Sequence, residues 1–167
     1  DILANNAIST VFQPIVNLGT SEAVGYEALA RCATDSPLRN PETLFNYAAR
    51  KHRIADLEIA CINTSIRLGG ALSKAAPIFL NVHPAAIAAG RRVPEAVFAA
   101  AERSGVSLNR IVLEITEQAS LGDPRQVIGP ISELTRAGVR FAFDDMGIAY
   151  SHLPLIGEIR PSFLKIS

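Results

Sequence analysis

Short strand-like segments alternate with longer helix-like segments along most of this chain, and that alternation constrains the fold more than any other feature. Four expected strands of this pattern cover residues 78–82, 111–115, 141–143 and 163–166. The expected helices cover residues 42–51, 54–72 and 94–104, a segment that starts at Asp123-Pro124 and ends before Gly138, and residues 153–159. Strands that alternate with helices form parallel sheets buried on both faces.

Two further expected strands, residues 10–16 and 24–31, open the chain. The turn Gly19-Thr20-Ser21 lies between them and predicts a hairpin. Six strands are therefore expected in total. An open doubly wound sheet and an incomplete barrel are both compatible with this number.

Composition narrows the class of protein. Hydrophobic residues make up 49% of the 167 residues and charged residues 19%, which is typical of a globular domain. The 16 basic and 16 acidic residues cancel, so no binding of a nucleic acid polymer or an anionic membrane is indicated. Cys32 and Cys61 lack CxxC spacing, so a zinc site is not expected.

The same sequence indicates a cytoplasmic location. No apolar run reaches the ~18 residues of a membrane span, and the first residues lack the layout of a signal peptide. Two separate cysteines suit a reducing compartment. The chain is therefore expected in the cytoplasm, on its own or as the cytoplasmic part of a larger membrane-anchored protein.

Polar side chains gather at the ends of the expected strands. They are Glu27, Asn81, Glu114, Asp144 with Asp145, and Lys165. In parallel sheets with helical connections, chemistry takes place beyond the carboxyl ends of the strands. One buried acid is most often a satisfied structural group, but several acids that converge repel one another unless a cation neutralises them.

Carboxylate and amide oxygens are ligands for Mg²⁺ or Mn²⁺ rather than for zinc or copper. Two such ions about 4 Å apart would hold both the attacking and the leaving oxygen of a phosphoryl displacement. Lys165 alone would be interpreted as a lysine that reaches solvent from a strand end. Beside this cluster it is interpreted as orienting the attacking water or offsetting phosphate charge. His83 is interpreted as structural, and Asp56 as structural or helix-capping.

Several motifs, in order, resemble the EAL domain, the cyclic-di-GMP-specific phosphodiesterase module of bacterial signalling proteins. They are Phe12-Gln13-Pro14-Ile15-Val16, Gly25-Tyr26-Glu27-Ala28-Leu29 with Arg31, Leu80-Asn81-Val82, Glu114-Ile115-Thr116-Glu117, Asp144-Asp145 with Gly147 and Tyr150-Ser151, and Lys165. The resemblance runs from about Val11 to the last residue. Each motif is weak alone, whereas the ordered series is a strong signal.

The resemblance implies a TIM-type (β/α) barrel whose first strand is antiparallel to the others, and hydrolysis of cyclic-di-GMP to linear pGpG with Mg²⁺ or Mn²⁺. About six of the eight barrel strands are present, so residues 1–167 are expected to be a single EAL-type domain truncated before the last two strands. The family dimerises through the loop after strand five, so a homodimer is among the assemblies implied. Further sensory or signalling domains are expected in the full-length protein.

The resemblance also assigns roles to individual residues. Glu27, Asn81, Glu114 and Asp144 are implied as metal ligands, and Asp145 as a ligand of a second metal. Lys165 is implied to contact the nucleophilic water, and Glu117 to anchor the loop after strand five. Gln13, Leu29 and Arg31 are implied to contact the dinucleotide; a guanidinium also matches phosphate oxygens in its own right.

Two departures from the family pattern keep a second function open. In the loop after strand five, Ile148 and Ala149 replace a threonine and a glycine, and the final strands with a further catalytic glutamate have no counterpart. The intact strand-end residues favour an active phosphodiesterase. The altered loop and the missing end favour a degenerate domain that binds cyclic-di-GMP or a protein partner without hydrolysis.

Overall fold

The computed structural model describes residues 2–3, 7–33, 37–116, 125–146 and 157–166. Its strands are β1 (Ile8–Val16), β2 (Ala23–Cys32), β3 (Ile78–Asn81), β4 (Ile111–Thr116), β5 (Arg140–Met146) and β6 (Phe163–Ile166). Its α-helices are α1 (Pro41–Arg50), α2 (Ile54–Gly69), α3 (Pro84–Ile87), α4 (Arg92–Ser104) and α5 (Arg125–Arg136). Short 3₁₀ helices cover Pro37–Arg39 and Leu108–Arg110.

The described strands form one six-stranded sheet in which spatial order follows chain order from β1 to β6. β1 runs antiparallel to β2, and every later pair is parallel. Within the described residues, β1 and β6 each pair with only one strand, so the sheet does not close. This confirms the prediction of an incomplete barrel with an antiparallel first strand.

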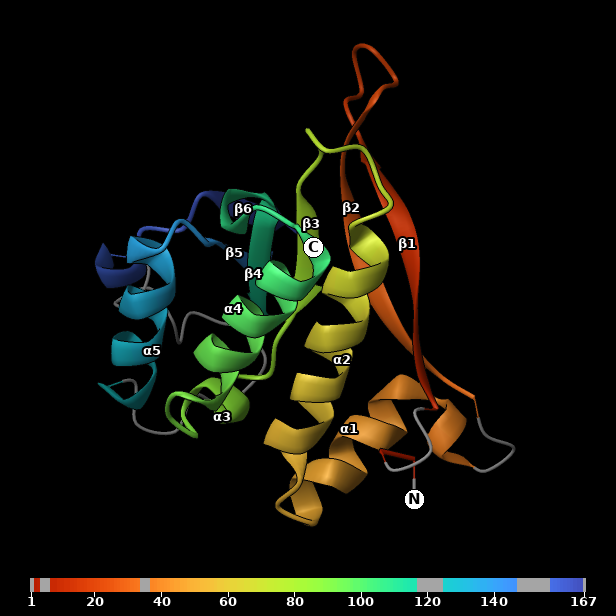
Figure 1. Cartoon of the computed structure of the whole chain (residues 1–167), viewed down its shortest axis with the longest axis vertical. Helices are drawn as coiled ribbons and strands as arrows, with labels where there is room; N and C mark the ends of the chain where they lie inside the picture. The colour runs from red at the N-terminus through yellow and green to blue at the C-terminus, as the bar shows by residue number, and fades with distance from the viewer. Residues whose placement is uncertain (1, 4–6, 34–36, 117–124, 147–156, 167) are drawn as a thin grey trace.

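The β1–β2 hairpin is the longest feature of the sheet and extends beyond the other strands (Figure 1). Its turn is held by Asn17, whose Oδ1 accepts hydrogen bonds from the backbone N–H groups of Gly19 and Thr20 at 2.8 and 3.1 Å. Such side-chain-to-backbone bonds are the reason that asparagine favours turns. The predicted hairpin is therefore confirmed.

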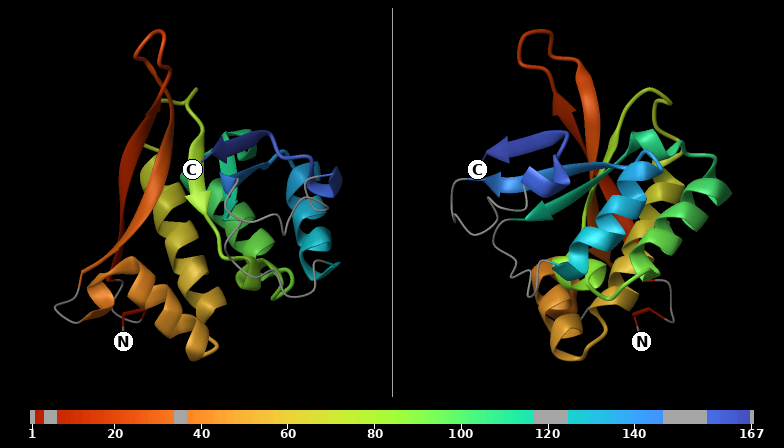
Figure 2. Two further views of the ribbon diagram at one scale, coloured as in Figure 1. Left: turned by 180° about the vertical axis from the view of Figure 1, so that it is seen from behind. Right: turned by 90° about the vertical axis from the view of Figure 1, so that its left-hand side faces the viewer.

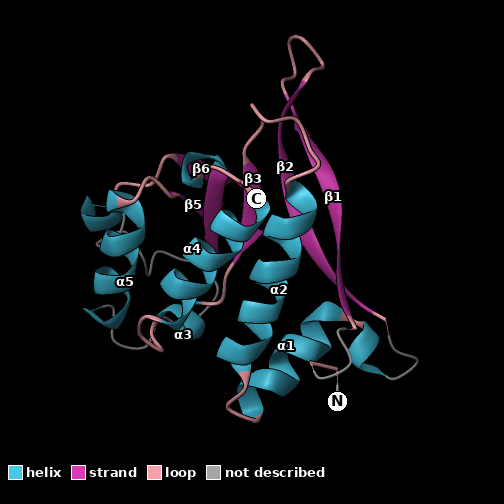
Figure 3. Ribbon diagram, viewed as in Figure 1, coloured by secondary structure: helices cyan, strands magenta, loops and turns pink. Residues whose placement is uncertain are grey.

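Helices cover one face of the sheet. α2, α4 and α5 stand side by side along its outer face, while α1 lies across the end of the hairpin near the N-terminus (Figures 1 and 3). Beneath them lies the main core, to which Leu80, Leu113 and Phe141 contribute from three neighbouring strands in register. The two further views show α2, α4 and α5 on one side of the strands (Figure 2).

The opposite, inner face of the sheet carries a smaller apolar cluster. Phe79, Val112 and Ala142 form it, with Ile15 and Phe163 packed against them. Gly25 allows this packing, since a Cβ there would lie 2.7 Å from Cε2 of Phe79, closer than atoms approach. This inner face is the one that carries the polar strand ends.

The helices predicted at 42–51, 54–72 and 94–104 and the one that ends before Gly138 are confirmed within the described residues, with small differences in their bounds. α2 ends at Gly69, earlier than the predicted 72, which agrees with the low helix propensity of the Gly69-Gly70 pair. α4 ends at Ser104 and is capped by Gly105, whose φ of 62° is the left-handed conformation that favours glycine. The short helix α3 was not predicted. It begins after His83, whose Nδ1 accepts a hydrogen bond from the N–H of Ala85.

Several sequence-based predictions lie outside the described residues. They are Glu117, the Asp123-Pro124 cap, the loop at 147–152 and the first part of the helix predicted at 153–159. No helix in the described ranges is both long and apolar enough to cross a bilayer.

Candidate functional site

Strand register brings the predicted site residues onto one face of the sheet. Asn81 on β3 is level with Glu114 on β4. Glu27 is level with Phe79, two residues before Asn81, and Asp144 lies two residues after Ala142, which is level with Glu114. Residues two apart on a strand share a face. Glu27, Asn81, Glu114 and Asp144 therefore all project on the inner face, directly beyond the apolar cluster.

The side chain of Lys165, from β6, lies at the centre of these residues. Its Nζ is 2.9 Å from Oε1 of Glu114, and 3.3 Å from both Oε2 of Glu27 and Oδ2 of Asp144. Asn81 joins the group through its Nδ2, which donates a hydrogen bond of 2.9 Å to Oε1 of Glu27. Five residues from five strands thus converge, and we call them the acidic centre.

Burial makes the acidic centre electrostatically unusual. Glu114 has no exposed surface. Its pKa is raised to about 7, chiefly by burial and further by the Glu27 and Asp144 carboxylates, while the Lys165 ammonium offsets part of the rise. Burial by itself would lower the pKa of Lys165, but Glu114, Glu27 and Asp144 outweigh it and raise that pKa above its ordinary value. The ammonium therefore neutralises part of a concentrated negative charge.

The oxygens of the acidic centre are of the kind that bind a divalent cation. Both carboxylate oxygens of Glu114 are buried and have no hydrogen-bond partner among the described residues, although Oε1 forms the ion pair with Lys165. Buried acceptors in this state favour a cation. Within the described residues no three His, Cys, Asp or Glu side chains are grouped so that they could hold a metal ion. The carboxylates of Glu27, Glu114 and Asp144 surround the ammonium of Lys165. The donor types fit a hard cation, which would share the neutralisation with Lys165.

Asp145 is placed differently from the other acids. Its φ of 57° is left-handed, and the register of β5 against β6 shifts between Phe143 and Met146. Its N–H donates a hydrogen bond of 2.9 Å to Oδ1 of Asp144. None of the ion pairs around Lys165 includes Asp145. Its role as ligand of a second metal stays a prediction.

The residues predicted to contact the dinucleotide lie beside the acidic centre. Gln13 is paired directly with Glu27 across the hairpin, and Leu29 and Arg31 follow Glu27 on the same strand face. Leu29, Arg31 and Asn81 also line a small pocket of about 160 Å³ between β2, α1 and α2. The guanidinium of Arg31 is exposed and donates a hydrogen bond only to the carbonyl of Ala30 within the described chain. Their role in binding a ligand stays a prediction.

One residue near the site was missed from the sequence. Glu58 of α2 is 1% exposed, and its Oε1 accepts a hydrogen bond of 2.7 Å from the N–H of His83, two residues after Asn81. It ties α2 to the segment that carries Asn81. A carboxylate on the core-facing side of α2, between Leu57 and Cys61, was the signal that could have found it. His83 also caps α3, since its Nδ1 accepts a hydrogen bond from the N–H of Ala85; its interpretation as structural stays a prediction.

Comparison with known proteins identifies the class. The EAL domain family matches residues 1–167, that is, the whole chain. The chain belongs to this family.

Named relatives agree with that assignment. A protein of Escherichia coli called probable cyclic di-GMP phosphodiesterase PdeB is 28% identical over 170 residues, which are 99% of this chain and 33% of that protein. Cyclic di-GMP phosphodiesterase TpdA of Vibrio parahaemolyticus is 27% identical over 158 residues, which are 92% of this chain and 25% of that protein. The chain spans a third or less of these two relatives.

Solved structures share the fold. The Bacillus subtilis YkuI protein, with an EAL domain, in complex with substrate c-di-GMP and calcium, has a TM-score of 0.76 and 26% identity over 99% of this chain and 42% of that chain. Klebsiella pneumoniae BlrP1 in a calcium and cyclic-di-GMP complex has a TM-score of 0.83 and 22% identity over 100% of this chain and 42% of that chain. Both likenesses agree with an α/β barrel architecture.

Proposed function

We propose that this chain carries the catalytic centre of a metal-dependent phosphodiesterase that hydrolyses cyclic-di-GMP to linear pGpG in bacterial second-messenger signalling. The observation that carries the proposal is the convergence of Glu27, Glu114 and Asp144 on the Nζ of Lys165 at 2.9–3.3 Å. Membership of the EAL family and relatives named as cyclic di-GMP phosphodiesterases support it.

The residues of the acidic centre would divide the work between binding a cation and positioning the reactants. Glu27, Asn81, Glu114 and Asp144 would hold Mg²⁺ or Mn²⁺, and Asp145 would serve a second ion. The chemistry that such a cation supplies is activation of a water nucleophile and neutralisation of phosphate charge. Lys165, whose raised pKa keeps it protonated, would orient the attacking water.

Substrate recognition would come from the strand faces next to the acidic centre. Arg31 would pair with phosphate oxygens, which match a guanidinium in shape and charge. Gln13 and Leu29 would contact the rest of the dinucleotide from the hairpin, and Glu117 would anchor the loop that follows β5. We also propose a cytoplasmic location, a homodimer and further signalling domains in the full-length protein.

The test is a product assay on the purified protein with cyclic-di-GMP and either Mg²⁺ or Mn²⁺, in which the linear dinucleotide is separated by chromatography. We expect turnover with the cation and none with a chelator. Glu27→Gln should abolish turnover, whereas Glu102→Gln, at an exposed position of α4, should leave it unchanged. Binding of cyclic-di-GMP without any product would instead support the sensor that the altered residues 148–149 favour.

A further inference from the structure

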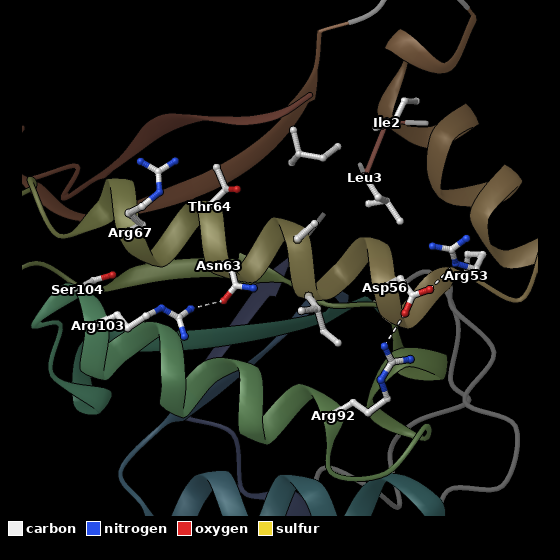
Figure 4. A pocket seen from close by; sticks show the side chains of 13 residues that line it. Ile2, Leu3, Arg53, Asp56, Asn63, Thr64, Arg67, Arg92, Arg103 and Ser104 are labelled. Atoms are coloured by element: carbon white, nitrogen blue, oxygen red, sulfur yellow. Dashed lines mark hydrogen bonds and ion pairs between the residues drawn. The ribbon is translucent and has the colours of Figure 1, made fainter. Parts of the chain in front are cut away.

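A second concave surface lies on the outer side of the helices, away from the acidic centre. It is a groove of about 790 Å³ between the N-terminal segment, α2 and α4 (Figure 4). From α2 it is lined by residues 56, 59, 60, 63, 64 and 67, which recur every three to four positions. They form one continuous helix face. We call this surface the basic groove.

Positive charge dominates the basic groove. Its lining includes four arginines, Arg53, Arg67, Arg92 and Arg103, and one acid, Asp56. Asp56 pairs with both Arg53 and Arg92, and these pairs lower its pKa. At the other end, and counting partners among the described residues, Arg103 donates only to Oδ1 of Asn63 and Arg67 has no hydrogen bond or ion pair. The whole chain is neutral, so this local excess of positive charge is a specific property of the surface.

The groove also has apolar walls. Ile2 and Leu3 line it from the N-terminal segment, and Ile59 and Ala60 line it from the middle of α2. In Figure 4 the Arg67 and Arg103 side chains lie at one end, and the pair of Arg53 and Arg92 around Asp56 lies at the other. The surface therefore combines an apolar middle with a cationic end whose guanidinium groups are exposed.

We propose that the basic groove binds an acidic amphipathic helix of a partner protein. Its apolar face would pack against Leu3 and Ile59, and its carboxylates would pair with Arg67 and Arg103. Arg53 and Arg67 are 14 positions apart on or next to one helix, which corresponds to about 21 Å or four helical turns. A groove of this length suits a helix of about 16 residues.

Other anionic ligands match the groove less well. A nucleotide base would stack on an aromatic ring, and no aromatic side chain is among the described residues that line the groove. A nucleic acid polymer is disfavoured by the zero net charge of the chain. A lipid bilayer is flat on this scale, whereas the surface is concave.

The test uses a labelled helical peptide of about 16 residues, with leucine on one face and glutamate on its flank, and measures fluorescence anisotropy with the whole protein. We expect micromolar binding. The double variant Arg67→Glu with Arg103→Glu should weaken it by about tenfold or more, because each lost charge-assisted pair contributes to affinity. Ile59→Ser should weaken binding of this peptide as well.

The matched control is the double variant Arg50→Glu with Arg136→Glu. These arginines are exposed and lie in the last turn of their helices, like Arg67 and Arg103. The two double variants therefore change the net charge and the interaction with the helix dipoles in the same way. This control should bind the peptide as the wild type does. Thermal melts of both double variants check folding.

Three results would overturn the proposal. The first is no binding of the patterned peptide, or equal binding of a peptide of the same composition with scrambled order, since charge alone would then explain the interaction. The second is an equal loss of affinity in the two double variants. The third is tighter binding of homopolymer RNA or of phosphatidylserine vesicles, lost with Arg67→Glu and Arg103→Glu, which would assign the groove to another class of partner.

Discussion

Nζ of Lys165 lies 2.9 Å from Oε1 of Glu114, a carboxylate with no exposed surface. Without a cation, this ammonium is the group that neutralises the acidic centre. A buried charge that loses its partner is strongly destabilising unless it changes protonation.

Lys165→Met should therefore make stability depend more strongly on pH. The ammonium of Lys165 lowers the pKa of Glu114. Without it, the pKa of Glu114 rises above about 7. A group whose folded pKa lies above its unfolded value loses its contribution to stability as pH rises. Urea unfolding without divalent cation should show a larger loss of stability at about pH 8 than at about pH 6. Lys165→Arg is the control that keeps the charge, and an equal loss at both pH values would contradict the prediction.

Asn81→Ala should weaken cation binding and catalysis together. The amide of Asn81 donates to Oε1 of Glu27, so the variant loses both a proposed oxygen ligand and the group that orients Glu27, the proposed ligand beside it. Loss of such orienting groups lowers metal affinity or activity by roughly 10–100-fold. The measurement is the rate of cyclic-di-GMP hydrolysis against Mn²⁺ concentration, in which the half-saturating concentration should rise. Asn46→Ala, at an exposed position of α1, should change neither quantity.

Glu58→Gln should flatten the pH dependence of stability. Burial raises the pKa of Glu58 to about 8 from an ordinary 4.5, and the N–H of His83 only partly offsets this. Between these values the folded protein keeps a proton that the unfolded chain has released. Its stabilising contribution is full below pH 4.5 and is lost as the pH rises through about 8.

Between these two pKa values, Glu58 lowers the free energy of unfolding by up to about 1.4 kcal/mol for each unit of rising pH. Glutamine keeps the acceptor for His83 and cannot ionise. Urea unfolding between about pH 5.5 and 7.5 should therefore give a shallower slope for Glu58→Gln than for the wild type. The raised pKa of Glu114 also makes stability fall as the pH rises, and it does so in both the wild type and the Glu58→Gln variant. Glu102→Gln should match the wild type, and identical slopes in all three would refute the assignment.

Arg110→Met should destabilise the fold without touching the acidic centre. The buried guanidinium of Arg110 donates to the carbonyls of Ala76 and Ser73 at 3.0 and 2.8 Å and reaches that of Gly69 at 3.5 Å. It thereby fastens the end of α2 to the start of β3. Removal leaves buried carbonyls without a donor and should lower the free energy of unfolding by about 2–4 kcal/mol. Denaturant unfolding measures this, with Arg136→Met on the exposed face of α5 as the control. A change below about 0.5 kcal/mol would contradict it.

Much of the fold and of the acidic centre was predictable from local patterns. The six strands follow from short apolar segments, and the hairpin follows from its turn. The convergence of Glu27, Asn81, Glu114 and Asp144 follows from a rule that needs no coordinates: parallel strands with helical connections carry their chemistry at one end. The residues of the acidic centre come from five strands in succession, so the same rule predicts the position of each one.

Glu58, Arg110 and the basic groove were not predictable in the same way. On α2, the periodicity indicates a helix with an apolar face, but neither the depth at which Glu58 is buried nor its bond to His83 follows from spacing. Arg67 and Arg103 belong to different helices, and only the packing of α2 against α4 brings them to one end of a groove.

By itself, the order of residues determined the secondary structure, the family and the oxygen donors at the strand ends, because these depend on short-range periodicity and on the carboxyl ends of parallel strands. Tertiary structure alone decided that Lys165 occupies the middle of those donors, that Asp145 has a left-handed backbone and is not among the ion-pair partners of Lys165, and that four arginines share one outer surface. The physical reason is that burial and charge depend on distances between segments far apart in the chain, and packing sets those distances.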